Sequence, residues 1–227
     1  MDLSVIIPAY NEEKTIGAIL KKIFEQHFDF SFEVIVVDSG SIDGTAAAVK
    51  DTQLPVLYIR QELSQGKGAA IRRGLEEVKG TYTIIQDADC EYDPGDYKAL
   101  MQPLLSGKAA VVYGSRIRKS GNAYSYARYY WGGRLLSLVT NILYGSRITD
   151  EPTCYKLFKT DLLLSLGLVC RGFEFCPEVT AKILKRHIPI VEIPISYNPR
   201  TREEGKKICW KDGVIALWTL LKLRFGQ

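Results

Sequence analysis

The chain has 227 residues, of which 46% are hydrophobic and 25% are charged, and its formal net charge is +4. This length suits one large domain with a substantial buried core, and so small a net charge gives no reason to expect nucleic acid as a partner. The five cysteines are odd in number and include no C-x-x-C pair, which disfavours a disulfide framework or a zinc site and indicates a reducing compartment.

The hydropathy pattern predicts neither a signal peptide nor a membrane-spanning helix. The N-terminal stretch MDLSVIIPAYNEE has no basic segment ahead of a long apolar run. The longest stretch without a charged residue, 135–146, is well short of the ~20 apolar residues that span a bilayer.

Short apolar runs alternate with helical patterns along the first half of the chain. The runs predict buried strands over residues 3–10, 32–38, 54–61, 81–87 and 109–116. Helical patterns cover residues 11–26 and 66–80 and begin again at Thr45 and Pro94, with Asn11 as the expected N-cap of the first helix. This alternation predicts an α/β sandwich with a mainly parallel central sheet flanked by helices.

The second half of the chain is less regular. Residues 120–145 are rich in tyrosine, a helix is predicted over 177–186 and a strand over 188–197, and a basic segment follows at 198–208. Residues 210–225 form a helical pattern whose apolar residues share one side: Trp210, Val214, Leu217, Trp218, Leu221 and Phe225.

Five carboxylates, Asp87, Asp89, Glu91, Asp93 and Asp96, fall within ten residues at the end of the fourth predicted strand. Polar segments also end the first two strands, and parallel α/β sheets bind ligands beyond the carboxyl ends of their strands. Asp87 and Asp89 are two apart and would share one face of an extended strand. Hard cations such as Mg²⁺ or Mn²⁺ prefer oxygen ligands and share them with phosphates, so the cluster indicates a metal that carries a phosphorylated ligand. The alternative is a solvated acidic turn.

Two other segments suit phosphate binding. Residues 66–68, Gly-Lys-Gly, bring backbone amides and an ammonium group together, although they lack the P-loop spacing and equally suit a helix start. The segment 198–208 contains four cations, Arg200, Arg202, Lys206 and Lys207, and arginine binds phosphate well. The alternative is a solvated loop.

Taken together, IIPAYNE, VVDSGSIDGT, GKGAAIRRGL and IIQDADCEYDP resemble, in order and spacing, the motifs of glycosyltransferase family 2, the inverting nucleotide-sugar transferases with the GT-A fold. YGSR, TDEPTCYKLF, GFEFCPEVTAKIL and PISYNPRTREEGKKI extend the likeness to nearly the whole chain. They resemble the branch of dolichol-phosphate mannose synthases and related polyprenyl-phosphate glycosyltransferases. The resemblance implies a single Rossmann-like GT-A catalytic domain over residues 1–208, followed by a C-terminal amphipathic helix at 209–227.

The resemblance also assigns the nucleotide site. Positions that hold the base and ribose are matched by Pro8, Tyr10, Glu12 and Asp38. Lys67 and Gly68 match the segment that closes over the nucleotide. One departure concerns the base: the family often has two aspartates where this chain has Asp38 followed by Ser39.

Metal and phosphate contacts follow from the same resemblance. Asp87 and Asp89 match the pair at the donor diphosphate and the metal, and Glu91 takes the place of a further metal ligand. Positions expected to contact donor or acceptor phosphates are matched by Arg116, Arg134, Ser137 and Arg202. Two residues depart from the family pattern: Cys176 replaces a common acidic residue and His187 a usual glycine.

The function that the resemblance implies is an inverting, Mg²⁺- or Mn²⁺-dependent transfer of a hexose from GDP-mannose or a UDP-hexose to a polyprenyl phosphate. A phosphate monoester is largely dianionic at neutral pH, so it needs cations to bind it and no general base. The sequence offers many cations and, as a base, only Asp150. The alternatives are a sugar hydroxyl as acceptor in glycan or polysaccharide synthesis, and a non-catalytic nucleotide-sugar-binding subunit. A nucleotidyltransferase is disfavoured because a glycine-rich N-terminal phosphate loop is absent.

Aromatic residues predict peripheral contact with the cytoplasmic face of a membrane. All three tryptophans lie in two segments, Trp131 in one and Trp210 with Trp218 in the other. Tyr124, Tyr126, Tyr129, Tyr130 and Tyr144 crowd the first segment, and Lys222 and Arg224 flank the end of the second. Tryptophan and tyrosine favour the headgroup level, where basic amphipathic helices also lie. The alternative is that both apolar stripes pack on the protein's own core or on a partner.

Overall fold

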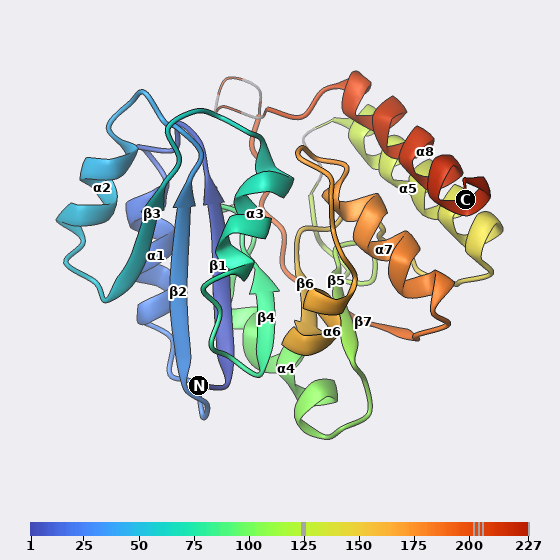
Figure 1. Cartoon of the computed structure of the whole chain (residues 1–227), viewed down its shortest axis with the longest axis horizontal. Coiled ribbons are helices and arrows are strands. Elements are labelled where there is room, and N and C mark those ends of the chain that lie inside the picture. Colours follow the sequence, from blue (N-terminus) through green and yellow to red (C-terminus); the bar gives the residue numbers. More distant parts are fainter. Residues whose placement is uncertain (124–125, 202, 204, 206, 227) are drawn as a thin grey trace.

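The structure, a computed structural model, describes residues 1–123, 126–201, 203, 205 and 207–226 and forms an α/β sandwich around a seven-stranded sheet (Figure 1). The strands are β1 (Leu3–Ala9), β2 (Phe32–Asp38), β3 (Val56–Arg60), β4 (Tyr82–Ile85), β5 (Val111–Ser115), β6 (Lys156–Lys159) and β7 (Ile190–Pro194). The helices are α1 (Ile16–Phe24), α2 (Thr45–Asp51), α3 (Lys67–Leu75), the 3-10 turn η1 (Pro94–Asp96), α4 (Tyr97–Leu105), α5 (Ala127–Tyr144), α6 (Thr160–Ser165), α7 (Phe175–Lys185) and α8 (Trp210–Phe225).

The strand order is β3-β2-β1-β4-β6-β5-β7. The first four strands in this order are parallel, β5 and β7 pair in parallel, and β6 runs antiparallel between β4 and β5. The predicted α/β sandwich with a mainly parallel sheet is therefore confirmed. Because Ala9 is in register with Asp38, and Ile6 with Ile85, the segments after β1, β2 and β4 emerge side by side at one edge of the sheet.

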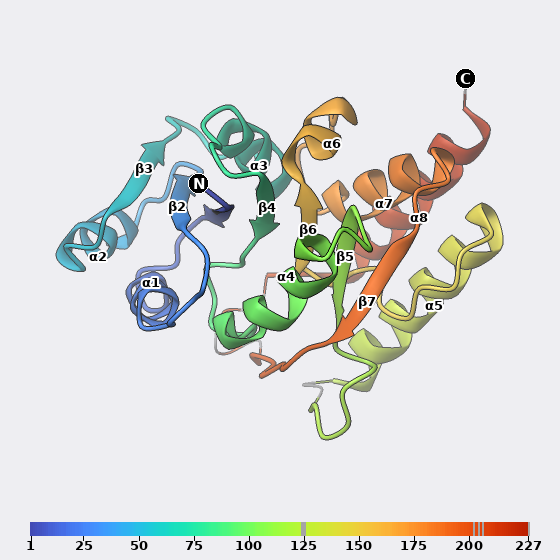
Figure 2. The same ribbon diagram turned by 90° about the horizontal axis from the view of Figure 1, so that it is seen from below.

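Helices cover both faces of the sheet because the buried strands are apolar on both sides. Figure 2 shows α3 and α6 on one face and α1 and α4 on the other. In β2, Ile35 and Val37 pack with Ala70 of α3, whereas Val34 and Val36 join the main core, which includes the buried side of α1. Alternate residues of one strand thus anchor opposite layers, as the two-residue period of a strand requires.

Two local predictions are wrong. The helix expected from residue 11 starts only at Ile16, and Asn11 is not its N-cap: Asn11 has φ 51° and its Oδ1 accepts a hydrogen bond from the Ile42 amide (2.9 Å). This contact ties the segment after β1 to the segment after β2. The strand expected over 81–87 ends at Ile85, so Asp87 and Asp89 lie beyond it and share no strand face.

The tyrosine-rich segment forms α5, and with α7 and α8 it builds a small separate core. Leu136, Ala181, Ala216 and Leu220 are buried together there. The Tyr144 hydroxyl donates to the Leu220 carbonyl (2.7 Å). Figure 1 shows α5 and α8 running side by side in the same direction. Within the described ranges of the chain, no helix is both long and apolar enough to cross a bilayer.

The helix predicted over 210–225 is confirmed, and its burial decides which side packs. Ala216 and Leu220 face α5 and α7, and Leu217 of the predicted apolar side packs, half-buried, against the same small core. The rest of that side, with Trp210, Trp218 and Phe225, is exposed in the described part of the chain.

Candidate active site

A cavity of about 960 Å³ opens where the carboxyl ends of β1 and β4 meet the N-terminal halves of α5 and α8. Eight predicted site residues line it: Pro8, Tyr10, Glu12, Lys67, Asp87, Asp89, Glu91 and Arg116. Asp38, Gly68 and Arg134 have other roles, described below. Arg202 lies outside the residues that the structure describes.

Arg200 lies at the centre of the acidic end of this cavity. Its guanidinium places Nη2 2.5 Å from Asp89 Oδ2, Nη1 3.1 Å from Glu12 Oε2, and Nε 3.8 Å from Glu91 Oε1. Its backbone amide also donates to Glu91 Oε1 (2.8 Å). Burial opposes the charge on Arg200, but Asp89 and Glu12 outweigh it and raise the pKa of this guanidinium. Three carboxylates from two different segments thus converge on one cation.

The crowding of carboxylates changes the acidity of Asp89. Burial, followed by the charges of Asp87 and Glu91, raises the pKa of Asp89 to about 7. Arg200 acts in the opposite direction but does not cancel these effects. Like charges in one buried site favour the neutral form of one member, so the cluster takes up positive charge readily.

A second basic side chain, Lys207, also contacts the acidic end of the cavity. Lys207 Nζ lies 2.6 Å from Glu12 Oε1, donates to the Tyr10 carbonyl oxygen, and sits 5.7 Å from the centre of the Tyr10 ring. The basic segment 198–208 therefore folds over the end of β1 through Arg200 and Lys207. The alternative of a purely solvated loop is wrong for these two residues.

The donor atoms around Arg200 are suitable for a hard divalent ion. Asp89, Glu91 and Glu12 supply carboxylate oxygens, the ligands that Mg²⁺ and Mn²⁺ prefer. Among the described residues, no three acidic, histidine or cysteine side chains are arranged as a ready-made metal site. The reason is that the three carboxylates point at the guanidinium of Arg200 rather than at a common empty position.

Lys67 and Asp87 form a half-buried ion pair in the cavity wall. Lys67 Nζ bonds Asp87 Oδ1, lies 3.5 Å from Cys154 Sγ, and sits 5.8 Å from the centre of the Phe173 ring. Burial alone would lower the pKa of Lys67, but Asp87 outweighs it and the pKa is raised. The same attraction lowers the pKa of Asp87 against the effect of its burial. Both groups are therefore charged at neutral pH.

Glycines bring Lys67 to this wall. Gly66 has φ +91°, and a Cβ there would lie 2.5 Å from the Arg171 carbonyl oxygen. At Gly68 a Cβ would lie 2.8 Å from the Cys170 carbonyl oxygen, and the Gly68 amide donates to the Gly172 carbonyl (3.1 Å). In this structure Gly68 serves close packing of the α3 start against residues 170–172. Nucleotide contact by Gly68 stays a prediction.

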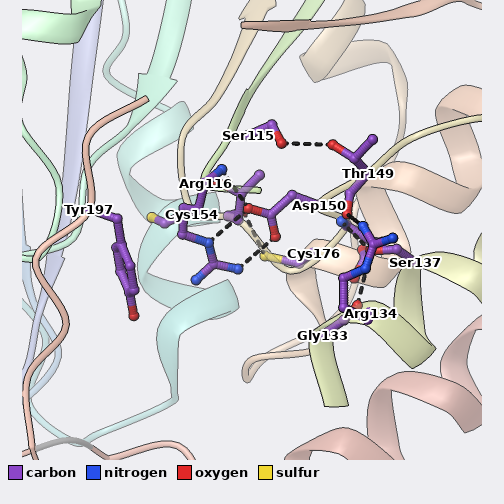
Figure 3. Close-up of polar contacts among 12 residues, drawn as sticks. Ser115, Arg116, Gly133, Arg134, Ser137, Thr149, Asp150, Cys154, Cys176 and Tyr197 are labelled. Carbon is purple, nitrogen blue, oxygen red and sulfur yellow. Dashed lines mark hydrogen bonds and ion pairs between the residues drawn. The ribbon is translucent and has the colours of Figure 1, made fainter. Parts of the chain in front are cut away.

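Arg116 and Asp150, which both line the cavity, form a two-pronged ion pair (Figure 3). Arg116 Nε lies 2.8 Å from Asp150 Oδ2, Arg116 Nη2 lies 2.7 Å from Asp150 Oδ1, and the Arg116 amide donates to Oδ2 (2.8 Å). The guanidinium also sits 5.0 Å from the centre of the Tyr197 ring. Burial opposes its charge, but Asp150 outweighs this and raises the pKa of Arg116. Both carboxylate oxygens of Asp150 are occupied.

The turn that carries Asp150 is fixed from two sides. Glu192 accepts from the Thr149 and Asp150 amides (2.8 Å and 3.0 Å to Oε1). From α5, Arg134 donates to the Thr149 carbonyl (3.2 Å), and the Ser137 hydroxyl accepts from the Glu151 amide (2.9 Å; Figure 3). Arg134 and Ser137 therefore position the turn in this structure, and their contact with a phosphate stays a prediction.

Asp38 likewise has a positioning role. Its buried carboxylate accepts from the Ser41 amide (2.8 Å) and the Tyr58 hydroxyl (2.5 Å). These bonds shape the turn after β2, next to the end of β1. Binding of the base by Asp38 is not tested by these contacts.

The sequence analysis did not include Arg200 among the residues expected to contact the donor or the metal, although it lies two residues before the predicted Arg202. The segment 198–208 contains several cations, and its sequence alone does not indicate which of them enters the site. The structure brings Arg200 into the site through its contacts with Glu12, Asp89 and Glu91. The apolar half of the cavity, formed by α5 and α8, was also not predicted.

The fold and this cavity define a glycosyltransferase with the GT-A fold. Solved structures share the architecture: glucosyl-3-phosphoglycerate synthase from Mycobacterium tuberculosis, in complex with Mg²⁺ and uridine diphosphate, superposes with a TM-score of 0.74 at 21% identity. That match covers 98% of this chain and 79% of the other. The chain belongs to glycosyl transferase family 2, whose family model matches residues 4–167.

Curated relatives refine the comparison. The chain is 28% identical to the UDP-N-acetylglucosamine–dolichyl-phosphate N-acetylglucosaminyltransferase of Methanococcus voltae, over 98% of this chain and 96% of that protein. It is 26% identical to the dolichol-phosphate mannosyltransferase of Pyrococcus furiosus, over 91% of this chain but only 59% of that protein. The resemblance to family 2 and to its polyprenyl-phosphate branch is confirmed.

Proposed function

We propose that this glycosyltransferase transfers a hexose, with inversion, from a nucleoside diphosphate sugar to a polyprenyl phosphate. One observation carries the proposal: carboxylates, arginines and apolar helix faces line a single cavity. The carboxylates Glu12, Asp89 and Glu91 gather around Arg200, Arg116 lines the same cavity, and α5 and α8 contribute apolar residues to its wall. A metal–diphosphate, a second phosphate and a lipid chain need these three environments.

For the donor, Asp89 and Glu91 would hold Mg²⁺ or Mn²⁺, which supplies charge neutralisation of the leaving diphosphate. Pro8, Tyr10 and Glu12 border the space for the nucleotide at the end of β1. Lys67, held by Asp87, presents a half-buried cation to the opposite side of the donor. The names of the two relatives specify different sugars, so the hexose and the base are left open between GDP-mannose and UDP-hexoses.

For the acceptor, the phosphate oxygen attacks the anomeric carbon from the face opposite the diphosphate. The new carbon–oxygen bond forms as the bond to the diphosphate breaks, and that electron pair leaves with the diphosphate. A dianionic phosphate has no proton to lose, so no base is required. The bonds of Asp150 support this: both of its oxygens are engaged by Arg116. We assign the incoming phosphate to Arg116 and Arg200, two of the cations that line the cavity.

An enzyme with a lipid acceptor has to act at a bilayer surface, and the exposed sides of α5 and α8 support membrane binding. We name this surface the apolar platform; it comprises Trp131, Leu135, Leu138 and Ile142 of α5 with Trp210, Val214, Trp218, Leu221 and Phe225 of α8. The tryptophans are 67%, 74% and 65% exposed, in chain order. So large an exposed apolar surface, with Lys222 and Arg224 at its end, suits peripheral binding to the cytoplasmic face of a membrane.

The proposal is tested with a donor panel and three acceptors. GDP-mannose, UDP-glucose and UDP-N-acetylglucosamine are each offered with Mn²⁺ to polyprenyl phosphate, free polyprenol or an oligosaccharide. We expect one donor to label polyprenyl phosphate alone. If the oligosaccharide or free polyprenol were labelled at the same rate, the acceptor would be a hydroxyl group. The proposed acceptor would then be wrong, although the protein would still be a glycosyltransferase.

A further inference from the structure

Phe173 lines the cavity with an aromatic ring, two residues before the start of α7. The residue is 39% exposed, and the centre of its ring lies 5.8 Å from Lys67 Nζ. One exposed apolar residue is ordinary on a protein surface and needs no explanation by itself. An exposed ring in the wall of a proposed substrate site is different, because it offers a flat apolar face to whatever the cavity binds.

The segment that carries Phe173 is held in place from two sides. Glu174 accepts hydrogen bonds from the amides of Arg171 and Gly172 (3.1 Å and 3.0 Å). The amide of Gly68, at the start of α3, donates to the Gly172 carbonyl (3.1 Å). These bonds fix the backbone next to the ring. The ring is therefore preorganised, which lowers the entropic cost of binding a ligand against it.

Through Lys67, Phe173 borders the donor side of the site. The ammonium group of Lys67 bonds Asp87, which lies two residues before the proposed metal ligand Asp89. A basic side chain and a divalent ion are the partners that a nucleoside diphosphate requires. We therefore expect the outer phosphate of the donor, and the hexose bonded to it, beside the Phe173 ring.

The same segment borders the acceptor side through Cys176. Cys176 lies three residues after Phe173, lines the same cavity, and places its Sγ 3.7 Å from the Thr153 carbonyl oxygen. Thr153 lies three residues after Asp150, the partner of Arg116, to which we assign the acceptor phosphate. During transfer the hexose has to lie between the leaving diphosphate and the incoming phosphate. The stretch from Phe173 to Cys176 spans this position.

We propose that the Phe173 ring stacks against the hexose of the donor and helps to select which hexose is transferred. The C–H bonds on one face of a pyranose carry a weak positive charge and the face of an aromatic ring a negative one, so the two faces attract. An epimer that turns a hydroxyl group toward the ring weakens this contact. The inference rests on the proposed function for its donor and adds to it a specificity-determining residue.

The test measures binding in the full chain, so it needs no acceptor. Calorimetry with Mg²⁺ gives the affinities for UDP-glucose, UDP-N-acetylglucosamine and GDP-mannose, and for UDP and GDP alone. Phe173→Tyr keeps the ring, Phe173→Leu keeps apolar volume without a flat face, and Phe173→Ala removes both. Val169→Ala is the control, because Val169 is 71% exposed in the same segment and is not among the described residues that line the cavity. Thermal unfolding reports on the fold of each variant.

We expect Phe173→Ala to weaken binding of the sugar nucleotide by about tenfold and to leave the affinity for the matching nucleoside diphosphate within about twofold. Phe173→Leu should lie between Phe173→Ala and wild type, whereas Phe173→Tyr and Val169→Ala should match wild type. A second comparison uses epimers, UDP-glucose with UDP-galactose or GDP-mannose with GDP-glucose. The preference of wild type for one epimer should shrink several-fold in Phe173→Ala.

Equal weakening of the sugar nucleotide and of the nucleoside diphosphate would show that the ring acts on the nucleotide or through Lys67, which overturns the proposal. Unchanged affinities in Phe173→Ala would also overturn it, and so would wild-type affinity in Phe173→Leu, since apolar volume would then be enough. If sugar nucleotides bind as expected but no prenyl phosphate is labelled, the proposed acceptor fails and the role of Phe173 stands. If wild type binds no sugar nucleotide, the proposed donor fails and the inference fails with it.

Discussion

Arg200 and Asp89 are separated by 111 residues in the chain, yet Arg200 Nη2 lies 2.5 Å from Asp89 Oδ2. This contact links the basic segment 198–208 to the acidic end of β4 and defines the point where a metal and a diphosphate are proposed to bind. A divalent ion held by Asp89 would compete with the guanidinium for the same oxygens, and Arg200 would then turn toward the incoming phosphates, which offer it anionic partners.

Removing the carboxylate of Asp89 should abolish transfer. Asp89→Ala takes away the oxygen that we assign to the metal, so we predict a loss of at least about a hundredfold in kcat, with the fold retained. EDTA should abolish wild-type activity and Mn²⁺ should restore it. The matched control is Asp93→Asn: Asp93 belongs to the same acidic segment but bonds the Gly95 amide (2.9 Å) and pairs with Lys22 (3.1 Å) at the surface. Wild-type activity of Asp89→Ala, or full activity in EDTA, would refute the metal assignment.

Arg200→Ala should make the protein less stable and more responsive to metal. Without the guanidinium, three carboxylates lose the cation that they share. We expect this to lower the free energy of unfolding by about 3 kcal/mol. Mg²⁺ then meets no competing guanidinium, so it should raise the melting temperature of the variant by more degrees than that of wild type. Arg200→Lys, which keeps the charge, should lie between the two. A variant that is destabilised but gains nothing extra from Mg²⁺ would show that Arg200 and the metal do not share these oxygens.

Arg116 and Asp150 should differ in how their loss affects the acceptor. Arg116→Ala removes a proposed phosphate contact, so KM for polyprenyl phosphate should rise by about tenfold or more. Asp150→Asn keeps a hydrogen-bonding partner for Arg116 and should lower kcat only several-fold. A loss of about a thousandfold or more in Asp150→Asn, within the range of lost base catalysis, would identify Asp150 as a base and favour a hydroxyl acceptor.

A further prediction concerns Arg202, which lies outside the residues that the structure describes. We expect Arg202→Ala to weaken acceptor use more than Asp150→Asn lowers turnover, if Arg202 reaches the acceptor phosphate. Direct comparison of Arg200→Ala with Arg202→Ala, each measured for KM of polyprenyl phosphate, separates the two arginines. If only Arg200→Ala raised the KM for polyprenyl phosphate, Arg200 rather than Arg202 would be the residue that binds the acceptor phosphate.

The apolar platform should bind anionic vesicles. We predict that wild type co-sediments with phosphatidylglycerol vesicles at low salt and that Trp131→Ala combined with Trp218→Ala weakens partitioning by about tenfold or more, since two large side chains no longer enter the headgroup region. Ile42→Ala is the control, because Ile42 is 88% exposed on the loop after β2, away from the platform. Failure of wild type to co-sediment, or an equal loss in the control, would contradict the platform.

The sequence by itself determined the elements whose signals are local. The apolar runs of β1 and β2, the glycine-led start of α3 and the helical period of residues 210–225 all predicted real elements, because periodicity and turn chemistry depend on neighbours in the chain. The order of carboxylates and glycines after the strands was also enough to indicate the family. Where local signals were weak, as in the four-residue β6 between longer segments, prediction failed.

Only the tertiary structure decided which charges meet and which faces stay open. The segment 198–208 offers several cations in the sequence, and only the structure shows that Arg200 contacts Asp89. Asp150 is a possible base from the sequence alone, and only the structure shows that both of its oxygens bond Arg116. Each of these outcomes depends on long-range packing, whose partners no local pattern specifies.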